Sequence, residues 1–378
     1  MYRGRRGTRV DWALWRVGRL KLLYILRGGR HARLALPDGQ YPDEFFYGYR
    51  QLARRPGWQV ELRERATTWA PGRALQRLVH AVTYLSPDFG GARELDRALL
   101  SRYDAIISTS EPVLMMLALR RRSRSAGARL VLILMGAEKR IERSRVPGVT
   151  RRVLRWALGA MDAIIVVGEG ERGYVLEEGL SAPGRVHVVP FGVDTAFWTP
   201  EPGGEEGPIL AVGNDDGRDY ELLLRSIGSH ALRIHTRLPV GALPPNVEVT
   251  GGSWQEAGLS DEQLRGLYRA SRFVVVPLRD SVQPQGQSVA LQAMACGKAV
   301  LLSRTRGLWG RGAMRHGENC HLVPPSDGEA LRAAIERLSA DAAYRDALGS
   351  AARRTVEEHF TSDRMATEIA TVIEGSRL

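Results

Sequence analysis

Short, unbroken runs of apolar residues alternate along the chain with stretches in which apolar positions recur every three or four residues. Nine such runs lie at residues 20–26, 104–109, 129–135, 162–168, 208–213, 232–236, 247–251, 272–278 and 298–303. Continuous apolar runs of this length are typical of parallel strands buried on both faces. Their alternation with amphipathic stretches predicts an α/β protein with helices on both sides of parallel sheets.

The pattern divides the chain into two parts. A stretch rich in proline, glycine and acidic residues, residues 191–208, separates the fourth run from the fifth. Such a composition is typical of a linker between domains. We therefore expect two doubly wound, Rossmann-like domains that face each other across a cleft, residues 1–192 and residues 193–360. A last helix, about residues 361–378, is expected to cross back and pack on the first domain.

Composition narrows the class of protein. The chain has 378 residues, 44% of them hydrophobic, which is enough for two cores. No run approaches the roughly 18 apolar residues that span a bilayer, and the basic N-terminus lacks the features of a secretory signal. Two cysteines make no disulfide framework or metal-ligand spacing. We expect a cytoplasmic protein, and the missing export signal argues against a periplasmic-type binding protein.

Charge is distributed unevenly within the net +12. Residues 1–190 hold 34 Lys and Arg against 18 Asp and Glu, whereas residues 191–378 hold 20 against 24. The basic half should face something anionic. Residues 3–20 and 143–160 combine arginine with tryptophan and leucine, which suits an anionic membrane surface as well as helices packed on their own sheet. No nucleic-acid recognition module is present, so nucleic acid is not an expected partner.

Open α/β sheets bind ligands at the carboxyl ends of their strands, so candidate site residues follow the predicted strands. Five of these positions are polar or contain glycine. They hold Gly28 and Gly29, then Glu138, then Gly213, Asn214 and Arg218, then Gly252 and Ser253, and finally Gln285, Gly286, Gln287 and Ser288. An ordinary strand-to-helix turn explains any one of them, but five together indicate a ligand cleft.

Several segments also occur in the order found in a known family. They are VHVVPFGVDTAFWTP (186–200), ILAVG followed by DYELLLRSI (219–227), PNVEVTGG with LYRASRFVVVPL, LQAMACGKAV (291–300) and HGENCHLVPPSDGEAL (316–331). In this order they resemble the retaining glycosyltransferases of the GT-B fold, family 4, which use nucleotide-activated sugars. The resemblance is clear in the second half and holds only in outline in the first. It implies a nucleotide-diphosphate sugar as co-substrate, no other cofactor and no metal.

The stretch PQGQSVALQAMACGKAV (284–300) reads as a loop, a short helix and the start of a strand. If Ser288 caps the helix, its free backbone N–H groups and positive dipole end point into the cleft, where a diphosphate would bind. Gly286 would let the backbone approach the ligand closely. The family usually carries two glutamates here, for the ribose and the transferred sugar, and this chain has Gln292 and Pro284 instead. An amide still bonds a hydroxyl, so Gln292 is expected to bind the ribose.

The family tends to place an arginine and a lysine against the diphosphate. Asn214 stands at the arginine position and Arg218 near the lysine position, so the resemblance implies one retained cation, which would stabilise charge on the leaving nucleotide. Asp215 and Asp216 could suggest a metal-binding pair, but adjacent acids in a glycine turn are commonly solvated. We expect no metal.

On the first domain, Gly28 and Gly29 are expected to present N–H groups to the donor. Glu138 and His80 are the candidates for acceptor binding or proton handling, although a surface acid and a helix histidine are the ordinary explanations. Front-face attack with retention lets the leaving phosphate take the acceptor's proton, so no general base is assigned.

These features predict a metal-independent, retaining glycosyltransferase that moves a sugar from a nucleotide-diphosphate sugar to an unknown acceptor, whether lipid-linked, a polysaccharide or a small molecule. The donor would lie mainly on residues 208–330 and the acceptor on residues 1–190, in the cytoplasm or at the inner face of its membrane. Two alternatives stay open. One is a GT-B nucleotide-sugar epimerase, and the other is a catalytically degenerate glycosyltransferase that acts as a binding or partner subunit.

Overall fold

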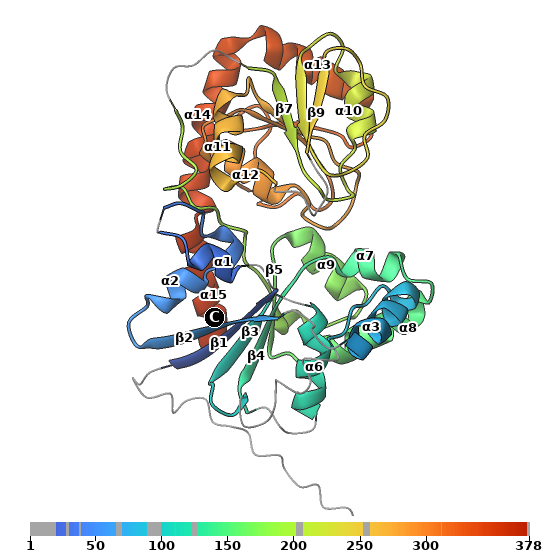
Figure 1. The fold of residues 1–378 in the computed structure, drawn as a ribbon, viewed down its shortest axis with the longest axis vertical. Coiled ribbons are helices and arrows are strands. Elements are labelled where there is room, and N and C mark those ends of the chain that lie inside the picture. Colours follow the sequence, from blue (N-terminus) through green and yellow to red (C-terminus); the bar gives the residue numbers. More distant parts are fainter. Residues whose placement is uncertain are drawn as a thin grey trace, which may run out of the picture.

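A computed structural model of the chain contains two separate six-stranded sheets (Figure 1). It describes residues 20–27, 30–37, 39–65, 70–88, 100–109, 111–122, 127–201, 207–251, 258–310 and 312–375. All strand pairs within the two sheets are parallel. The predicted α/β class is therefore confirmed.

The strands of each sheet are neighbours in an order that differs from the chain order. The first sheet has the order β2 (Trp58–Arg65), β1 (Leu20–Arg27), β3 (Ala105–Ser108), β4 (Arg129–Leu134), β5 (Ala163–Val166) and β6 (Val186–Val188). The second has the order β12 (His321–Val323), β11 (Val300–Ser303), β10 (Val274–Val276), β7 (Ile209–Val212), β8 (Leu232–His235) and β9 (Val247–Thr250). In both, the chain starts at an inner strand, runs to one edge and then continues on the other side of the first strand, which is the doubly wound topology.

Helices cover both faces of each sheet (Figure 1). On one face of the first sheet lie α6 (Glu111–Arg122), α7 (Ala137–Glu142), α8 (Pro147–Leu158) with α3 (Ala70–Thr83) packed on it, and α9 (Glu169–Glu177). On the other lie α1 (His31–Leu34), α2 (Tyr49–Ala53) and α15 (Ser362–Glu374). The second sheet has α10 (Tyr220–Ser226) and α13 (Gly328–Ala340) on one side, and α11 (Asp261–Ala270), α12 (Gln287–Ala295) and α14 (Ala342–His359) on the other. None of the described helices has both the length and the apolar character to span a bilayer.

All nine strands expected from the apolar runs are present, each within a few residues of its expected limits. Three further strands, β2, β6 and β12, were not expected, and all three lie at a sheet edge. β2 and β6 are only partly buried, so they need no continuous apolar run. β12 is buried but has only three residues, one of them His321, so it leaves no long apolar run in the sequence. In β2 the exposed residues alternate with half-buried ones, and the sequence WQVELRER carries that pattern only weakly.

A single apolar core continues from one sheet to the other. Alternate residues of β1 point to opposite faces, so Leu22 joins this core and Leu23 joins the core on the other face. The shared core runs through Phe191, Trp198 and Phe360, which lie where the chain passes between the sheets. The two halves are therefore joined by buried apolar contacts as well as by the chain itself.

The chain passes between the two sheets twice, and the two crossings are hydrogen-bonded together. The backbone N–H of Val193 donates to the carbonyl of Phe360 at 2.8 Å, and the N–H of Ser362 donates to the carbonyl of Val193 at 3.0 Å. The helix that follows, α15, packs on α2 and β5 of the first sheet. The limits of the two domains, residues 1–192 and 193–360, remain a prediction.

Gly192 gives a test of how tightly the crossings pack. A Cβ there would lie 2.2 Å from the Thr361 carbonyl oxygen and 2.9 Å from the Ser362 nitrogen, and backbone atoms cannot move away cheaply. Gly192→Ala should lower the free energy of unfolding by about 2 kcal/mol in chemical denaturation. The control is Gly184→Ala, where an added Cβ has nothing within 4 Å. Equal stability of the two variants would show that the crossings are loosely packed.

Candidate active site

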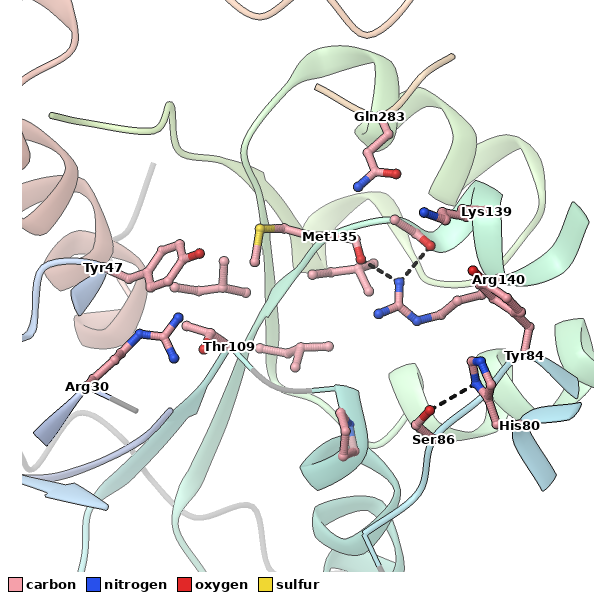
Figure 2. Close-up of a pocket in the computed structure, with 15 residues that line it drawn as sticks. Arg30, Tyr47, His80, Tyr84, Ser86, Thr109, Met135, Lys139, Arg140 and Gln283 are labelled. Carbon is pink, nitrogen blue, oxygen red and sulfur yellow. Dashed lines mark hydrogen bonds between the residues drawn. The ribbon is translucent and has the colours of Figure 1, made fainter. Parts of the chain in front are cut away.

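A cavity of about 520 Å³ opens at the carboxyl ends of β3 and β4 (Figure 2). Its lining comes from β4, from the start of α7, from the end of α3 and from Gln283 in the loop after β10 of the second sheet. Three cations line it, Arg30, Lys139 and Arg140, and none of the described lining residues is acidic. The cavity is therefore suited to an anionic or hydroxyl-rich ligand.

The two guanidinium groups are directed into the space between them (Figure 2). Arg30 Nε donates to the carbonyl of Phe45 at 2.8 Å, and Arg140 Nη1 donates to the carbonyl of Gly136 at 2.6 Å. These backbone acceptors fix the direction of each side chain. The ammonium of Lys139 pairs with Asp216 of the second sheet at 2.6 Å.

His80 lines the same cavity, on the acceptor side that the sequence predicted for it. Its Nδ1 lies 3.0 Å from the Ser86 hydroxyl, and its ring lies 4.7 Å from the ring of Tyr84. These two contacts hold the imidazole at the cavity wall. A role for His80 in acceptor binding remains a prediction.

Glu138 is buried and reaches across to the second sheet rather than into the cavity. Its Oε2 accepts hydrogen bonds from the Ser281 hydroxyl and, at 3.0 Å, from the Val282 N–H, while Oε1 lies 3.4 Å from Arg306 Nη2. All three partners belong to loops at the carboxyl edge of the second sheet. The carboxylate therefore joins the two domains, and a role in proton handling remains a prediction.

Arg218 lies at the carboxyl edge of the second sheet and is almost fully enclosed. Its side chain is 2% exposed and lies between Gly213 and Gly286. A Cβ at Gly213 would lie 2.0 Å from Arg218 Nε, and one at Gly286 would lie 2.6 Å from Arg218 Nη1. Both glycines have positive φ, of 153° and 73°. They supply the space that the guanidinium fills, as well as a backbone shape that other residues rarely adopt.

The guanidinium of Arg218 is only partly paired. Nη2 lies 3.2 Å from Asp215 Oδ2, while Nε and Nη1 have no hydrogen-bond partner although both are buried. Buried donors without an acceptor are rare because each costs about 1–3 kcal/mol. An anion bound beside Gly286 would satisfy these donors.

The helix α12 begins at the same place. Gly286 occupies its N-cap position, and no side chain caps this end within the described part of the chain. The expectation that Ser288 caps the helix is wrong, because the left-handed Gly286 starts the helix two residues earlier, at Gln287. The first backbone N–H groups of α12 therefore lie beside Arg218, and together they form a candidate anion site.

Two further cavities border this anion site. A cavity of about 220 Å³ is lined by Gln285, Gly286, Gln287 and Ser288 together with residues of the first domain such as Phe45. The amide of Gln287 donates to the carbonyl of Val167, at 3.3 Å, and Gln285 packs against Gly217. Arg218 itself lines a cavity of about 680 Å³ that lies over α10 and residues 238–242. The structure therefore brings together the donor-site residues predicted on these two loops.

Gln292 lies deeper than expected, in a buried network between the domains. It is 2% exposed; its Nε2 donates to Glu44 Oε1 at 2.9 Å, and its Oε1 accepts from the Tyr268 hydroxyl at 3.2 Å. Trp198 Nε1 donates to the same Glu44 oxygen at 2.7 Å. Burial raises the pKa of Glu44 to about 7, although the hydrogen bonds from Gln292 and Trp198 act in the opposite direction and lower it. The ribose-binding role of Gln292 remains a prediction, and its amide is already engaged on both sides.

The remaining polar residues of the β7 loop also have partners. Asn214 Oδ1 accepts from the backbone N–H of Arg237 at 2.7 Å. Asp215 pairs with Arg218, and Asp216 pairs with Lys139 and Arg143 of the first domain, which lower the pKa of Asp216. The adjacent acids thus pair with cations of this chain. The predicted donor residues Gly28, Gly29, Gly252 and Ser253 lie outside the described residues.

Two family models match the chain, one on each domain. "Glycosyltransferase Family 4" matches residues 49–197, and "Glycosyl transferases group 1" matches residues 211–341. Between them they cover most of the chain, and the gap between them falls in the linker. The chain belongs to the group 1, family 4 glycosyltransferases. The resemblance read from the sequence is confirmed.

Two curated relatives of this chain are 26% and 28% identical to it over the residues that align. "MMP alpha-(1->4)-mannosyltransferase" of Mycolicibacterium hassiacum is 26% identical over 56% of this chain and 53% of its own length. "Alpha-maltose-1-phosphate synthase" of Mycolicibacterium smegmatis is 28% identical over 58% of this chain and 65% of its own. The chain thus matches about half to two thirds of the length of these relatives. They give no support to the epimerase alternative.

Solved structures confirm the GT-B fold of this glycosyltransferase. Sucrose-phosphate synthase from Thermosynechococcus elongatus superposes with a TM-score of 0.70 and 19% identity, over 94% of this chain and 99% of its own. HepE of Anabaena, solved with UDP-glucose, has a TM-score of 0.67 and 16% identity, over 94% of this chain and 100% of its own. At such low identity the likeness concerns the fold.

Several residues of the site were not named from the sequence. Arg30 and Arg140 follow the same strands as Gly28 and Glu138, so position indicated the region, but nothing distinguishes an arginine in a cavity from one at the surface. Glu44 lies in YPDEFFYGYR, which has no periodicity to predict its burial. Its place in the site is recognised only from its hydrogen bond with Gln292 in the folded chain.

The contact between Glu44 and Gln292 predicts that a glutamate at position 292 would destabilise the fold. Gln292→Glu would bring two carboxylates together in a buried site, where like charges cannot both ionise. We expect it to lower the free energy of unfolding by about 3 kcal/mol in chemical denaturation. Glu44→Gln combined with Gln292→Glu should recover at least half of the loss.

The matched control is Gln263→Glu in α11. Gln263 is exposed and forms a capping box with Ser260, in which glutamate serves equally well, so its stability should not change. A Gln292→Glu variant as stable as the parent would show that Glu44 does not decide the residue at position 292.

Proposed function

We propose that this glycosyltransferase moves a sugar from a nucleotide-diphosphate sugar to an acceptor bound on the first domain, with retention of the anomeric configuration. The observation that carries the proposal is the buried, partly unpaired guanidinium of Arg218 beside the uncapped start of α12. A cation and a helix N-terminus together favour a diphosphate, which carries negative charge at fixed spacing. HepE was solved with UDP-glucose, which supports a donor of this class.

The same groups would assist the chemical step. When the bond between sugar and phosphate breaks, negative charge grows on the diphosphate, and Arg218 with the α12 N–H groups is already oriented to receive it. The carboxylate that the family places on the transferred sugar is replaced by Pro284, and Glu138 is held by Ser281 and Val282. Neither Pro284 nor the held Glu138 would serve as a base, so the leaving phosphate would accept the acceptor's proton. Attack from the same face gives retention.

The acceptor would occupy the 520 Å³ cavity. Arg30 and Arg140 are directed into it, and Gln283 borders it from the donor side, so an acceptor there would lie next to the donor loop (Figure 2). Three lining cations without a lining acid favour an acceptor that carries phosphate or carboxylate. We propose a metal-independent reaction, because Asp215 and Asp216 are already paired with cations of the chain. We also propose that transfer takes place at an anionic membrane surface.

A catalytically degenerate subunit is the second candidate, and the loss of both family glutamates favours it. Such a protein would bind the nucleotide-sugar without turning it over. The two candidates therefore share the donor site and differ in chemistry.

Donor binding can be measured by thermal shift with UDP-, GDP-, ADP- and dTDP-sugars. A ligand at about 100 times its dissociation constant should stabilise the protein by about 2.7 kcal/mol. Arg218→Met removes the charge while keeping the volume, and should abolish most of the shift. The control is Arg315→Met, since Arg315 is exposed and pairs with Glu318 outside these cavities. An undiminished shift in Arg218→Met would place the donor elsewhere.

Turnover separates the two candidates. We expect slow hydrolysis of the preferred nucleotide-sugar even without acceptor, followed by proton NMR of the released sugar, whose first-formed anomer should match that of the donor. The opposite anomer would exclude retention. Binding with no hydrolysis, and no transfer to phosphorylated or lipid acceptors, would favour the degenerate subunit.

A further inference from the structure

The helix α3 presents an unusual face to solvent. Leu75, Leu78 and Val82 are 46%, 64% and 38% exposed, and their spacing places them along one stripe of the helix. Arg73 and Arg77 on the same helix are also exposed, and the sequence of α3, APGRALQRLVHAVT, contains no acidic residue. Exposed apolar side chains are common singly, but a row of them on one helix marks an interaction surface.

The start of α8 extends this surface. The Arg145 N–H donates to the carbonyl of Val82 at 2.9 Å, and the Thr150 hydroxyl donates to the carbonyl of Thr83 at 3.0 Å, so the end of α3 lies against the start of α8. Val149 there is 48% exposed, and α8 contains no acidic residue. We call the exposed parts of residues 73–82 and 145–152 the α3–α8 face.

We propose that the α3–α8 face docks on an anionic lipid bilayer. Leucine and valine side chains would enter the boundary between headgroups and acyl chains, while the flanking arginines contact anionic headgroups. Charge favours lipid over a second copy of this chain, because residues 73–82 and 145–152 hold arginines and no acid, so two such faces would bring like charges together. Arg151 pairs with Glu178 of this chain, and Arg73, Arg77 and Arg145 lie exposed on the face. Of the two segments suggested by composition, residues 143–160 contribute residues 145–152 to this face, whereas residues 3–19 of the N-terminal segment lie outside the described residues.

The α3–α8 face adjoins the proposed acceptor cavity. His80 of α3 lines that cavity, and so does Tyr84, the first residue after α3. Leu78 and Val82 of the same helix face solvent. A bilayer on this face would therefore lie at the rim of the cavity, within reach of an acceptor held in the membrane. This consequence rests on the proposed function, whereas lipid binding itself does not.

The test is co-sedimentation of the full chain with vesicles, without any turnover. We expect binding to vesicles of phosphatidylcholine with phosphatidylglycerol and little binding to phosphatidylcholine alone. Replacing Leu75, Leu78 and Val82 together by serine should lower the partition coefficient at least tenfold. The control is Leu243→Ser, a matched change at a 47% exposed leucine of the second domain. Unchanged thermal unfolding of both variants would exclude misfolding as the cause.

The arginines can be tested separately. Arg73→Gln with Arg77→Gln should lower binding to the anionic vesicles by about tenfold, and added salt should have the same effect. Equal binding of the serine variant and the parent would overturn the proposal. So would a parent that sediments as a dimer and a serine variant that sediments as a monomer, since the face would then be a contact between copies. Lost lipid binding with intact donor binding would leave the proposed function standing.

Discussion

The buried guanidinium of Arg218 is the constraint on which the cleft of the second domain depends. A charged group enclosed with two unpaired donors is expensive, so its surroundings must be shaped around it. Gly213 ends β7 and Gly286 starts α12, and a side chain at either position would collide with the guanidinium. The glycines and the arginine, far apart in the sequence, therefore form one arrangement. Its unpaired Nη1 lies beside Gly286 at the uncapped start of α12, so an anion would complement this arrangement.

A second constraint is the polar contact between the domains. Glu138 holds the loop after β10, Asp216 pairs with Lys139 across the cleft, and Glu44 accepts from Gln292. Glutamine at position 292 follows from this arrangement, because a glutamate would face Glu44 in a site that already raises the pKa of that carboxyl to about 7. The residue at position 292 is thus coupled to a residue of the other domain.

The sequence was sufficient for the central strands because full burial demands continuous apolar runs, and it missed β2, β6 and β12 because the first two are only partly buried and β12 has only three residues. It located Arg218 and the start of α12 from their place after strands. It placed the helix cap wrongly at Ser288, since a left-handed glycine can begin a helix without a capping side chain. Glu44 could not be found, because its significance lies in a partner 248 residues away.

The fold places the excess cations of the first half of the chain in two kinds of surroundings. Acids of the second half pair with some cations of the first, as Asp216 does with Lys139 and Arg143. Other cations line the 520 Å³ cavity, which has no acid among its described lining residues, or lie on α3, which contains none. Helix α3 contributes to both places, because His80 lines the cavity while Arg73 and Arg77 face solvent. A wall of the cavity and an apolar stripe flanked by arginines therefore share one helix. An acceptor that is both anionic and membrane-held would meet both features at once.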